Sequence, residues 1–158
     1  MQHTLLAVGI TREAWIRTGT ADYADRLRHY TRFTYLETPD LKLRGAKGTP
    51  DIVREGEAAL IERALAGVDH LILLDERGKA YDSPGLARHI AGLQQRSLKH
   101  VCWVIGGPYG FHERIRERSH GSWSLGPLTF SHQMIRPFAA EQLYRAHTIL
   151  AGEPYHHA

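Results

Sequence analysis

The sequence predicts an α/β fold in which a mostly parallel sheet is flanked by helices. Strand-like segments alternate with segments of helical spacing along the chain. Two of them, HLILLD at 70–75 and HVCWVI at 100–105, are almost entirely apolar, as strands are when both faces of a sheet are covered. Because the chain has 158 residues and no repeat, low-complexity tract or linker, we expect a single domain over residues 1–158.

Three elements are expected before residue 40. TLLAVG at 4–9 has the composition of a buried strand, and FTYLE at 33–37 alternates as a second strand that stops before Pro39. Between them, residues 12–30 have helical spacing. The residues close to one face of that helix are Trp15, Tyr23, Leu27 and Tyr30.

A second helix is expected from Pro50 to about Ala66, because proline suits the first turn and Thr49 can cap it. Ser83-Pro84 has the same form and predicts a helix to about Leu98. The second helix should bury Ile52, Ala59, Leu60, Ala64 and Leu65.

The last third is expected to hold a short helix at 113–119, an interrupted strand and a long helix. WSLGPLTF at 123–130 has the composition of a strand interrupted by Gly126-Pro127. The final helix should begin near Pro137 and end by Gly152. Its core-facing residues should be Ala139, Leu143, Ala146 and Leu150.

Bulk composition gives weak signals about partners. The net charge of +3 and pI of about 9.2 favour a polyanionic partner only mildly. The 11 histidines are scattered and form no HExxH motif, so we expect no metal site. The single cysteine, Cys102, fits a reducing compartment. No apolar run approaches the roughly 20 residues of a membrane span, and the N-terminus is no signal peptide, so we expect a cytoplasmic protein.

Three predicted strands end in unusual residues where open parallel sheets bind ligands: at 74–75, at 105–107 and at 125–130. The last two are the first candidates for a ligand site. Gly106, Gly107 and Gly110 let the backbone approach a ligand closely, although a tight turn alone explains them equally well. The segment 125–130 should bend at Pro127 and leave backbone groups free for an adenine ring. Its structural alternative is an edge strand broken by proline.

Polar residues near the C-terminus form a third candidate. His132 is followed by Arg136, Glu141 and Arg145. The simplest structural roles are a helix-capping or buried histidine and a surface ion pair between Glu141 and Arg145 at i, i+4.

Basic residues suited to RNA phosphates occur in the loop with Lys42, Arg44 and Lys47 and in the turn with Arg77 and Lys79. Arg114, Arg116 and Arg118 alternate with Glu113 and Glu117, so a solvated helix face is the better interpretation of that cluster.

Four stretches together resemble the SPOUT-class methyltransferases that modify N3 of a pseudouridine in large-subunit ribosomal RNA. They are LLAVGI at 5–10, LLDERGK at 73–79, VIGGPYGF at 104–111 and LTFSHQMIRPFAAEQLYRAHTILAGEPYHH at 128–157. Each glycine motif is weak alone, but the ordered set covers essentially the whole chain. The resemblance implies an α/β knot, with a deep trefoil knot in the cofactor-binding part at about 100–158, an exception to the general absence of knots.

The resemblance also implies a cofactor, a partner and site residues. The cofactor is S-adenosyl-L-methionine, and the enzyme is a homodimer in which two subunits pack through the last helix and both contribute to each RNA site. The residues implied to contact the cofactor are Leu74, Gly106, Leu125, Gly126, Pro127, Leu128, Thr129 and Phe130. The candidates for proton acceptance or base orientation are His132, Tyr155 and His156, while Arg136 and Arg145 are candidates for contacts to phosphate or to the uracil oxygens.

Two departures from the family pattern affect loop geometry. Pro137 stands where other members often carry an aliphatic residue, and Gly126-Pro127 is stiffer than the usual polar residues. The alternatives to a methyltransferase are a non-catalytic module that binds the ribosome or assists its assembly, and an enzyme that uses residues 106–110 as a phosphate loop. The last lacks the Lys-Ser/Thr pair and acidic metal ligands that such a loop needs.

Overall fold

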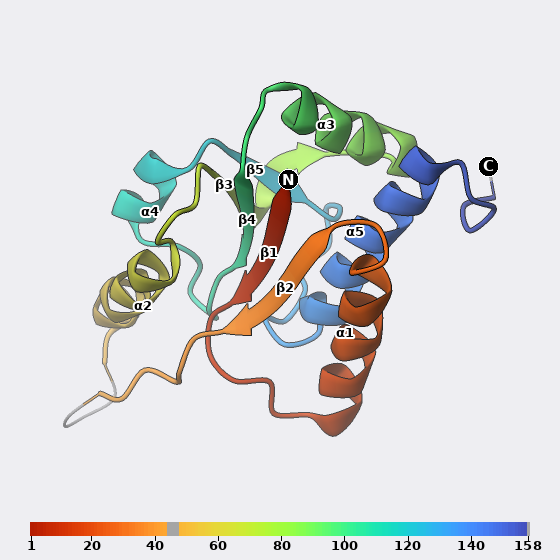
Figure 1. Ribbon diagram of the computed structural model, residues 1–158. Helices are drawn as coiled ribbons and strands as arrows, with labels where there is room; N and C mark the ends of the chain where they lie inside the picture. Colours follow the sequence, from red (N-terminus) through yellow and green to blue (C-terminus); the bar gives the residue numbers. More distant parts are fainter. Residues whose placement is uncertain (44–47, 158) are drawn as a thin grey trace.

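The computed structural model describes residues 1–43 and 48–157 and confirms the α/β fold (Figure 1). The elements alternate along the chain in the order expected from the sequence. They are β1 (Gln2–Ala7), α1 (Ala14–Leu27), β2 (Arg32–Glu37), α2 (Pro50–Ala64), β3 (His70–Ala80), α3 (Ser83–Gln95), β4 (His100–Ile105), α4 (Glu113–Arg118), β5 (Gly121–Ser124) and α5 (Ile135–Ala151).

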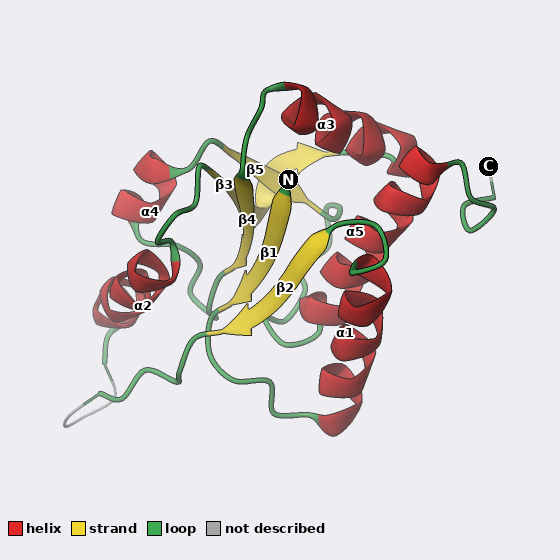
Figure 2. Ribbon diagram, in the orientation of Figure 1, coloured by secondary structure: helices red, strands yellow, loops and turns green. Residues whose placement is uncertain are grey.

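The described strands form one parallel sheet in the order β2-β1-β4-β3-β5. Helices α1, α3 and α5 lie on one face and α2 and α4 on the other (Figure 2). Side chains from β1 alternate between the two faces of the sheet. Leu5 and Ala7 pack in the core beneath α1, α3 and α5, whereas Leu6 and the following Val8 pack in the core beneath α2 and α4. The runs 71–74 of β3 and 101–105 of β4 are therefore apolar because each of their faces is covered.

Short local interactions set the helix boundaries. The Thr49 hydroxyl accepts a hydrogen bond from the Ile52 amide at 3.4 Å, which confirms it as the cap of α2. Gly152 ends α5 in the left-handed conformation, with φ of 71°. The cap of α3 is Asp82, whose carboxylate accepts from the Gly85 amide at 2.6 Å, and not Ser83 as the Ser-Pro pattern predicts. The cap residue therefore lies one position earlier in the chain than the Ser-Pro pattern indicates.

The predicted strand at 123–130 is wrong beyond Ser124. Strand β5 covers only Gly121–Ser124, and the following residues leave the sheet. Gly126 has φ of 134°, which L side chains rarely adopt, and Pro127 cannot donate to a strand ladder. The final helix begins at Ile135, two residues before Pro137, which still lies in the first turn where its missing amide is tolerated.

Three apolar residues expected in the core are exposed instead: Trp15, Ile52 and Leu150. The buried face of α1 runs through the smaller Thr20 and Ala24, which allow α5 to pack closely. Ile52 precedes the buried face of α2, which begins at Glu57, and Leu150 lies in the last turn before the exposed residues 151–154. Hydrophobicity alone therefore misplaced residues near helix ends.

The segment between β5 and α5 crosses the edge of the sheet where the strands end. The Thr129 hydroxyl donates to the Glu76 carboxylate at 3.2 Å, beside β3. Further along, the Gln133 side chain accepts from the Arg12 amide and donates to the Ile10 carbonyl, each at 3.1 Å, just after β1. The segment thus spans the sheet from β3 to β1. The knot implied for about 100–158 stays a prediction.

Gly78 lies where β3 and β5 come closest. A Cβ placed there would lie 2.7 Å from the Trp123 nitrogen and 2.8 Å from the Ser122 carbonyl carbon, both backbone atoms that cannot move without disrupting the pairing. We therefore expect Gly78→Ala to lower the free energy of unfolding by about 2–4 kcal/mol, measured by urea denaturation.

Gly92→Ala provides the matched control, because a Cβ at this position in α3 meets nothing within 4 Å. This substitution should leave stability unchanged or raise it by up to about 1 kcal/mol. Equal effects of the two substitutions would contradict the contact assigned to Gly78.

Candidate functional site

A cavity of about 880 Å³ lies at the carboxyl ends of β4 and β5, beside the part of β3 that follows its pairing with β4. Three segments line it: residues 74–77 after the buried part of β3, residues 105–111 after β4, and residues of 123–135 that leave β5 and lead to α5. The two segments that the sequence analysis selected for their glycines and proline therefore face one another across a single space.

The glycine turn after β4 needs its glycines for close packing. A Cβ on Gly106 would lie 3.1 Å from the Phe111 ring, and one on Gly107 would lie 2.2 Å from a carboxylate oxygen of Glu57. Gly110 has φ of 75°, and its amide donates to the Gly107 carbonyl at 3.1 Å. The turn is thus compact and presents backbone, with few side chains, to the cavity.

The bend after β5 is held by Ser124. Its hydroxyl donates to the Gly126 carbonyl at 2.9 Å and accepts from the Gly126 amide at 3.1 Å. Beyond the bend, the Leu128 side chain is 73% exposed. The wall therefore combines a locally fixed turn with an apolar side chain that has no cover in the described part of one chain.

Asp75 and Arg116 form an ion pair of 2.7 Å in the cavity wall. Burial alone would raise the pKa of Asp75, but hydrogen bonds from the Arg77 amide and from Arg116 outweigh it and lower the pKa. The pair joins α4 to the end of β3. Arg116 therefore does not lie on a purely solvated helix face, as its alternation with glutamates predicts, and the position of Asp75 after a buried run is the sequence signal for this contact.

Most of the residues implied to contact a cofactor line this cavity. They are Leu74, Gly106, Leu125, Gly126, Leu128, Thr129 and Phe130, whereas Pro127 is exposed and does not line it. Sequence reasoning missed Arg54, which lies in α2 far from the glycine motifs and reaches the cavity through its contact with the Tyr109 carbonyl at 3.5 Å.

His132 also lines the cavity. Burial lowers its pKa, and the positive charges of Arg136 and Arg12 lower it further. The imidazole is therefore neutral at pH 7 and can accept a proton or a hydrogen bond.

Arg136 has a different place from the one expected. Its side chain is fully buried, and its guanidinium donates to the Val8 carbonyl at 2.9 Å, to the Gly9 carbonyl at 3.0 Å and to the Thr11 hydroxyl at 2.7 Å. It also contacts the Glu37 carboxylate at 3.3 Å and the His132 carbonyl at 3.0 Å. A guanidinium with this set of partners is not available to phosphate, so the expected contact to RNA is corrected to a structural role.

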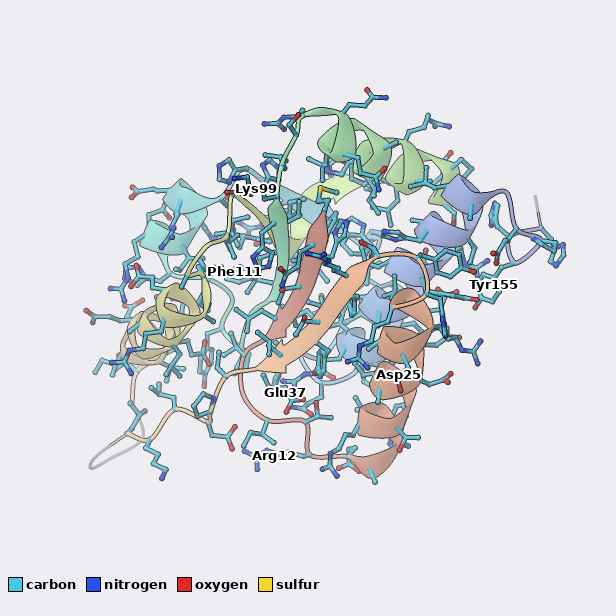
Figure 3. The ribbon with its side chains drawn as sticks, viewed as in Figure 1. Arg12, Asp25, Glu37, Lys99, Phe111 and Tyr155 are labelled. Carbon is cyan, nitrogen blue, oxygen red and sulfur yellow. The ribbon has the colours of Figure 1, made fainter. Side chains whose placement is uncertain are left out.

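The C-terminal tail lies away from the cavity within one chain. The Tyr155 hydroxyl donates to the Glu141 carboxylate at 3.1 Å, and the Arg145 guanidinium lies 4.7 Å from the centre of the Tyr155 ring. Figure 3 shows Tyr155 beside α5 and Phe111 on the side of the sheet that α2 covers. Neither Tyr155 nor His156 lines the cavity, so the structure separates them from His132.

The basic residues proposed for RNA are dispersed. Arg77 lines the cavity, Lys42 is exposed on the connection between β2 and α2, and the Lys79 ammonium lies 4.9 Å from the centre of the Tyr81 ring. Arg44 and Lys47 lie outside the described residues. None of the helices in the described part of the chain has both the length and the apolar character needed to cross a membrane.

Comparisons with known proteins agree along the whole chain. A family model described as predicted SPOUT methyltransferase matches residues 1–156. The chain is 42% identical to the ribosomal RNA large subunit methyltransferase H of Cytophaga hutchinsonii over 157 residues, covering 99% of this chain and 100% of the relative. It is 43% identical to the protein of the same name from Pelobacter propionicus, again covering 99% and 100%.

Solved structures show the same fold. A probable methyltransferase from Bordetella pertussis superposes with a TM-score of 0.53 at 16% identity, covering 92% of this chain and 95% of that one. A probable methylase family protein from Haemophilus influenzae gives a TM-score of 0.51 at 11% identity, covering 99% and 70%.

The buried contacts of Arg136 lead to a stability prediction. A lysine retains the charge, but its single nitrogen cannot reach the partners that three guanidinium nitrogens contact. We expect Arg136→Lys to lower the free energy of unfolding by about 3–5 kcal/mol in urea denaturation, because buried carbonyls and Glu37 lose their partners. Arg26→Lys, at an exposed i, i+4 pair with Asp22, should change it by less than about 0.5 kcal/mol. Unchanged stability of Arg136→Lys would return Arg136 to the candidates for RNA contact.

Proposed function

The chain belongs to the SPOUT methyltransferase family, and we propose that it transfers a methyl group from S-adenosylmethionine to N3 of a pseudouridine in large-subunit ribosomal RNA. The observation that carries the proposal is the cavity between the glycine turn after β4 and the bend after β5, in a chain that aligns end to end with ribosomal RNA methyltransferases. We place the enzyme in the cytoplasm, with its substrate.

The cavity residues fit S-adenosylmethionine in size and chemistry. About 880 Å³ is in the range of pockets that enclose ligands of this size. Leu74, Ile105 and Leu125 supply apolar surface for an adenine ring, while the backbone at 106–107 and 126–130 supplies hydrogen-bonding groups beside it. When bound, the donor supplies a methyl group on a positively charged sulfur, which is a good leaving centre.

The transfer is a direct displacement. N3 of the base loses its proton and forms a bond to the methyl carbon as the carbon–sulfur bond breaks, which leaves S-adenosylhomocysteine. Alignment of the two reactants is the main task of the protein and can supply up to about 7–11 kcal/mol in ideal cases. His132 is neutral and lines the cavity, so we assign it the role of accepting the N3 proton or orienting the base.

A homodimer completes the site in this proposal. Three apolar side chains close to the cavity are exposed in one chain: Leu128, Met134 and Phe138. Phe138 lies on α5 and packs against Phe130, with ring centres 5.6 Å apart. An interface on this surface would bring the tail of a second copy, with Tyr155 and His156, toward a cavity that its own tail does not reach.

Basic residues at the cavity indicate how RNA would approach. Arg54 and Arg77 line it, and Lys42 and Arg145 are further candidates in the proposal for contacts to the phosphate backbone.

The decisive experiment is methyl transfer in vitro. Purified protein with methyl-labelled S-adenosylmethionine is incubated with 70S ribosomes or naked ribosomal RNA from cells lacking the gene, and the methylated nucleotide is mapped. We expect label at N3 of one pseudouridine in the large-subunit RNA. Donor binding without incorporation into either substrate would instead favour a non-catalytic module that binds the ribosome.

Deletion of residues 155–158 tests the role of the tail. Since Tyr155 and His156 do not line the cavity of their own chain, donor binding by calorimetry should change less than threefold, an estimate of about 0.6 kcal/mol. Methyl transfer should fall at least a hundredfold, by about 2.7 kcal/mol or more. A variant lacking only residues 157–158 should retain activity, and full activity of the longer deletion would exclude the tail from the reaction.

A further inference from the structure

We propose that the Glu57 carboxylate, lying behind the glycine turn, makes the cavity prefer the positively charged methyl donor to its neutral product. The inference rests on the proposed function and assigns a selectivity role to a residue of α2 that does not itself line the cavity.

Glu57 contacts the cavity wall from outside. A Cβ on Gly107 would lie 2.2 Å and 2.4 Å from the two carboxylate oxygens, so the carboxylate occupies the space where a side chain of residue 107 would be. Gly107 lines the cavity, so the carboxylate lies directly against a residue of the cavity wall. A glycine at this position therefore lets a buried negative charge approach a ligand closely.

One oxygen of the Glu57 carboxylate is buried without a polar partner among the described residues. This oxygen is Oε2, and Glu57 as a whole is 7% exposed. A buried polar group without a partner costs stability, so its presence needs an explanation. A cation in the adjacent cavity supplies one.

The other carboxylates of the wall are already compensated or exposed. Asp75 is paired with Arg116, and Glu76 is exposed and accepts from Thr129 at 3.2 Å. Arg54, Arg77 and Arg116 place positive charge around the same space. Arg54 and Arg116 are paired with Asp51 and Asp75, so Glu57 adds a further negative charge beside a wall whose charges are largely compensated.

The donor and the product differ in charge. S-adenosylmethionine carries one net positive charge near neutral pH, whereas S-adenosylhomocysteine is neutral because it lacks the sulfonium. An ionised Glu57 attracts the donor more strongly than the product, and the low dielectric constant of the protein interior strengthens this attraction. The product formed by the reaction thus loses part of its affinity, which assists its release.

The ionisation of Glu57 gives a second readout. Burial raises the pKa of Glu57 to about 7. The charged groups on the neighbouring elements are engaged elsewhere: Arg54 on α2 with Asp51, and Arg114 and Arg116 on α4 with Glu62 and Asp75. A bound cation favours the ionised form and lowers this pKa, so the preference for the donor should grow as the pH rises through 7.

The test measures dissociation constants of S-adenosylmethionine and S-adenosylhomocysteine by calorimetry at pH 6 and pH 8. At pH 8 we expect Glu57→Gln to reduce the preference for the donor over the product about tenfold, corresponding to about 1.4 kcal/mol. Between pH 6 and pH 8 the preference should rise more in the wild type than in the variant, a comparison that cancels the titration of the ligands. Glu55→Gln, at an exposed position on the same helix, should match the wild type.

A stability measurement shows whether the Glu57→Gln variant is folded, as the comparison of affinities requires. Because the pKa of Glu57 is raised on folding, its ionisation destabilises the folded state; this penalty grows as the pH rises from the unfolded pKa of about 4.5 through about 7 and then levels off. Glu57→Gln should therefore gain stability relative to the wild type between pH 5.5 and pH 8.5 in urea denaturation. If Glu57→Gln is too unstable to purify, Glu57→Asp, whose shorter side chain withdraws the charge, should lower the preference in the same direction.

An unchanged ratio of the two affinities in Glu57→Gln, whether or not both ligands bind more weakly, would overturn the inference. Absence of binding of either ligand to the wild type would refute the proposed donor itself, so the two failures are distinguishable.

Discussion

The buried guanidinium of Arg136 is the contact on which the arrangement of the site depends. It joins the carbonyls that follow β1, the Glu37 carboxylate at the end of β2 and the His132 carbonyl before α5. These segments are distant in the sequence, and the contact closes the last of them over the edge of the sheet. A buried charge is costly without partners, so these segments must keep the positions in which they supply them.

The cavity follows from this closure and from the parallel sheet. Parallel strands point the same way, so the turns after β4 and β5 meet at one edge of the sheet, beside residues 74–77 of β3 (Figure 1). Glycine at 106 and 107 thins one wall, and the Ser124 hydroxyl holds the bend of the other. The walls therefore include two close-packed backbone turns, with charged groups such as Asp75, Arg116 and Glu57 in or behind them.

The separation of the cavity from Tyr155 bears on the proposed mechanism. Within one chain the tail packs on α5 through Glu141 and Arg145, while exposed apolar side chains such as Leu128 and Phe138 surround the cavity. The proposed homodimer accounts for both features with one interface. Residues 128–157 resemble one functional motif, yet within one chain the part at 128–135 lines the cavity and the tail does not. A dimer would bring the two parts of the motif together at each site.

Local patterns in the sequence determined the order of elements, the apolar central strands, the Thr49 cap and the glycine-rich turn, because each depends on neighbours along the chain. The sequence also predicted the bend at Gly126-Pro127, but not that the strand before it ends at Ser124. Tertiary structure alone decided that Arg136 is buried, that Arg116 pairs with Asp75, and that Glu57 lies behind Gly107. A charged side chain has the same local signature whether solvent or a distant segment satisfies it, and only the packing of the folded chain distinguishes the two.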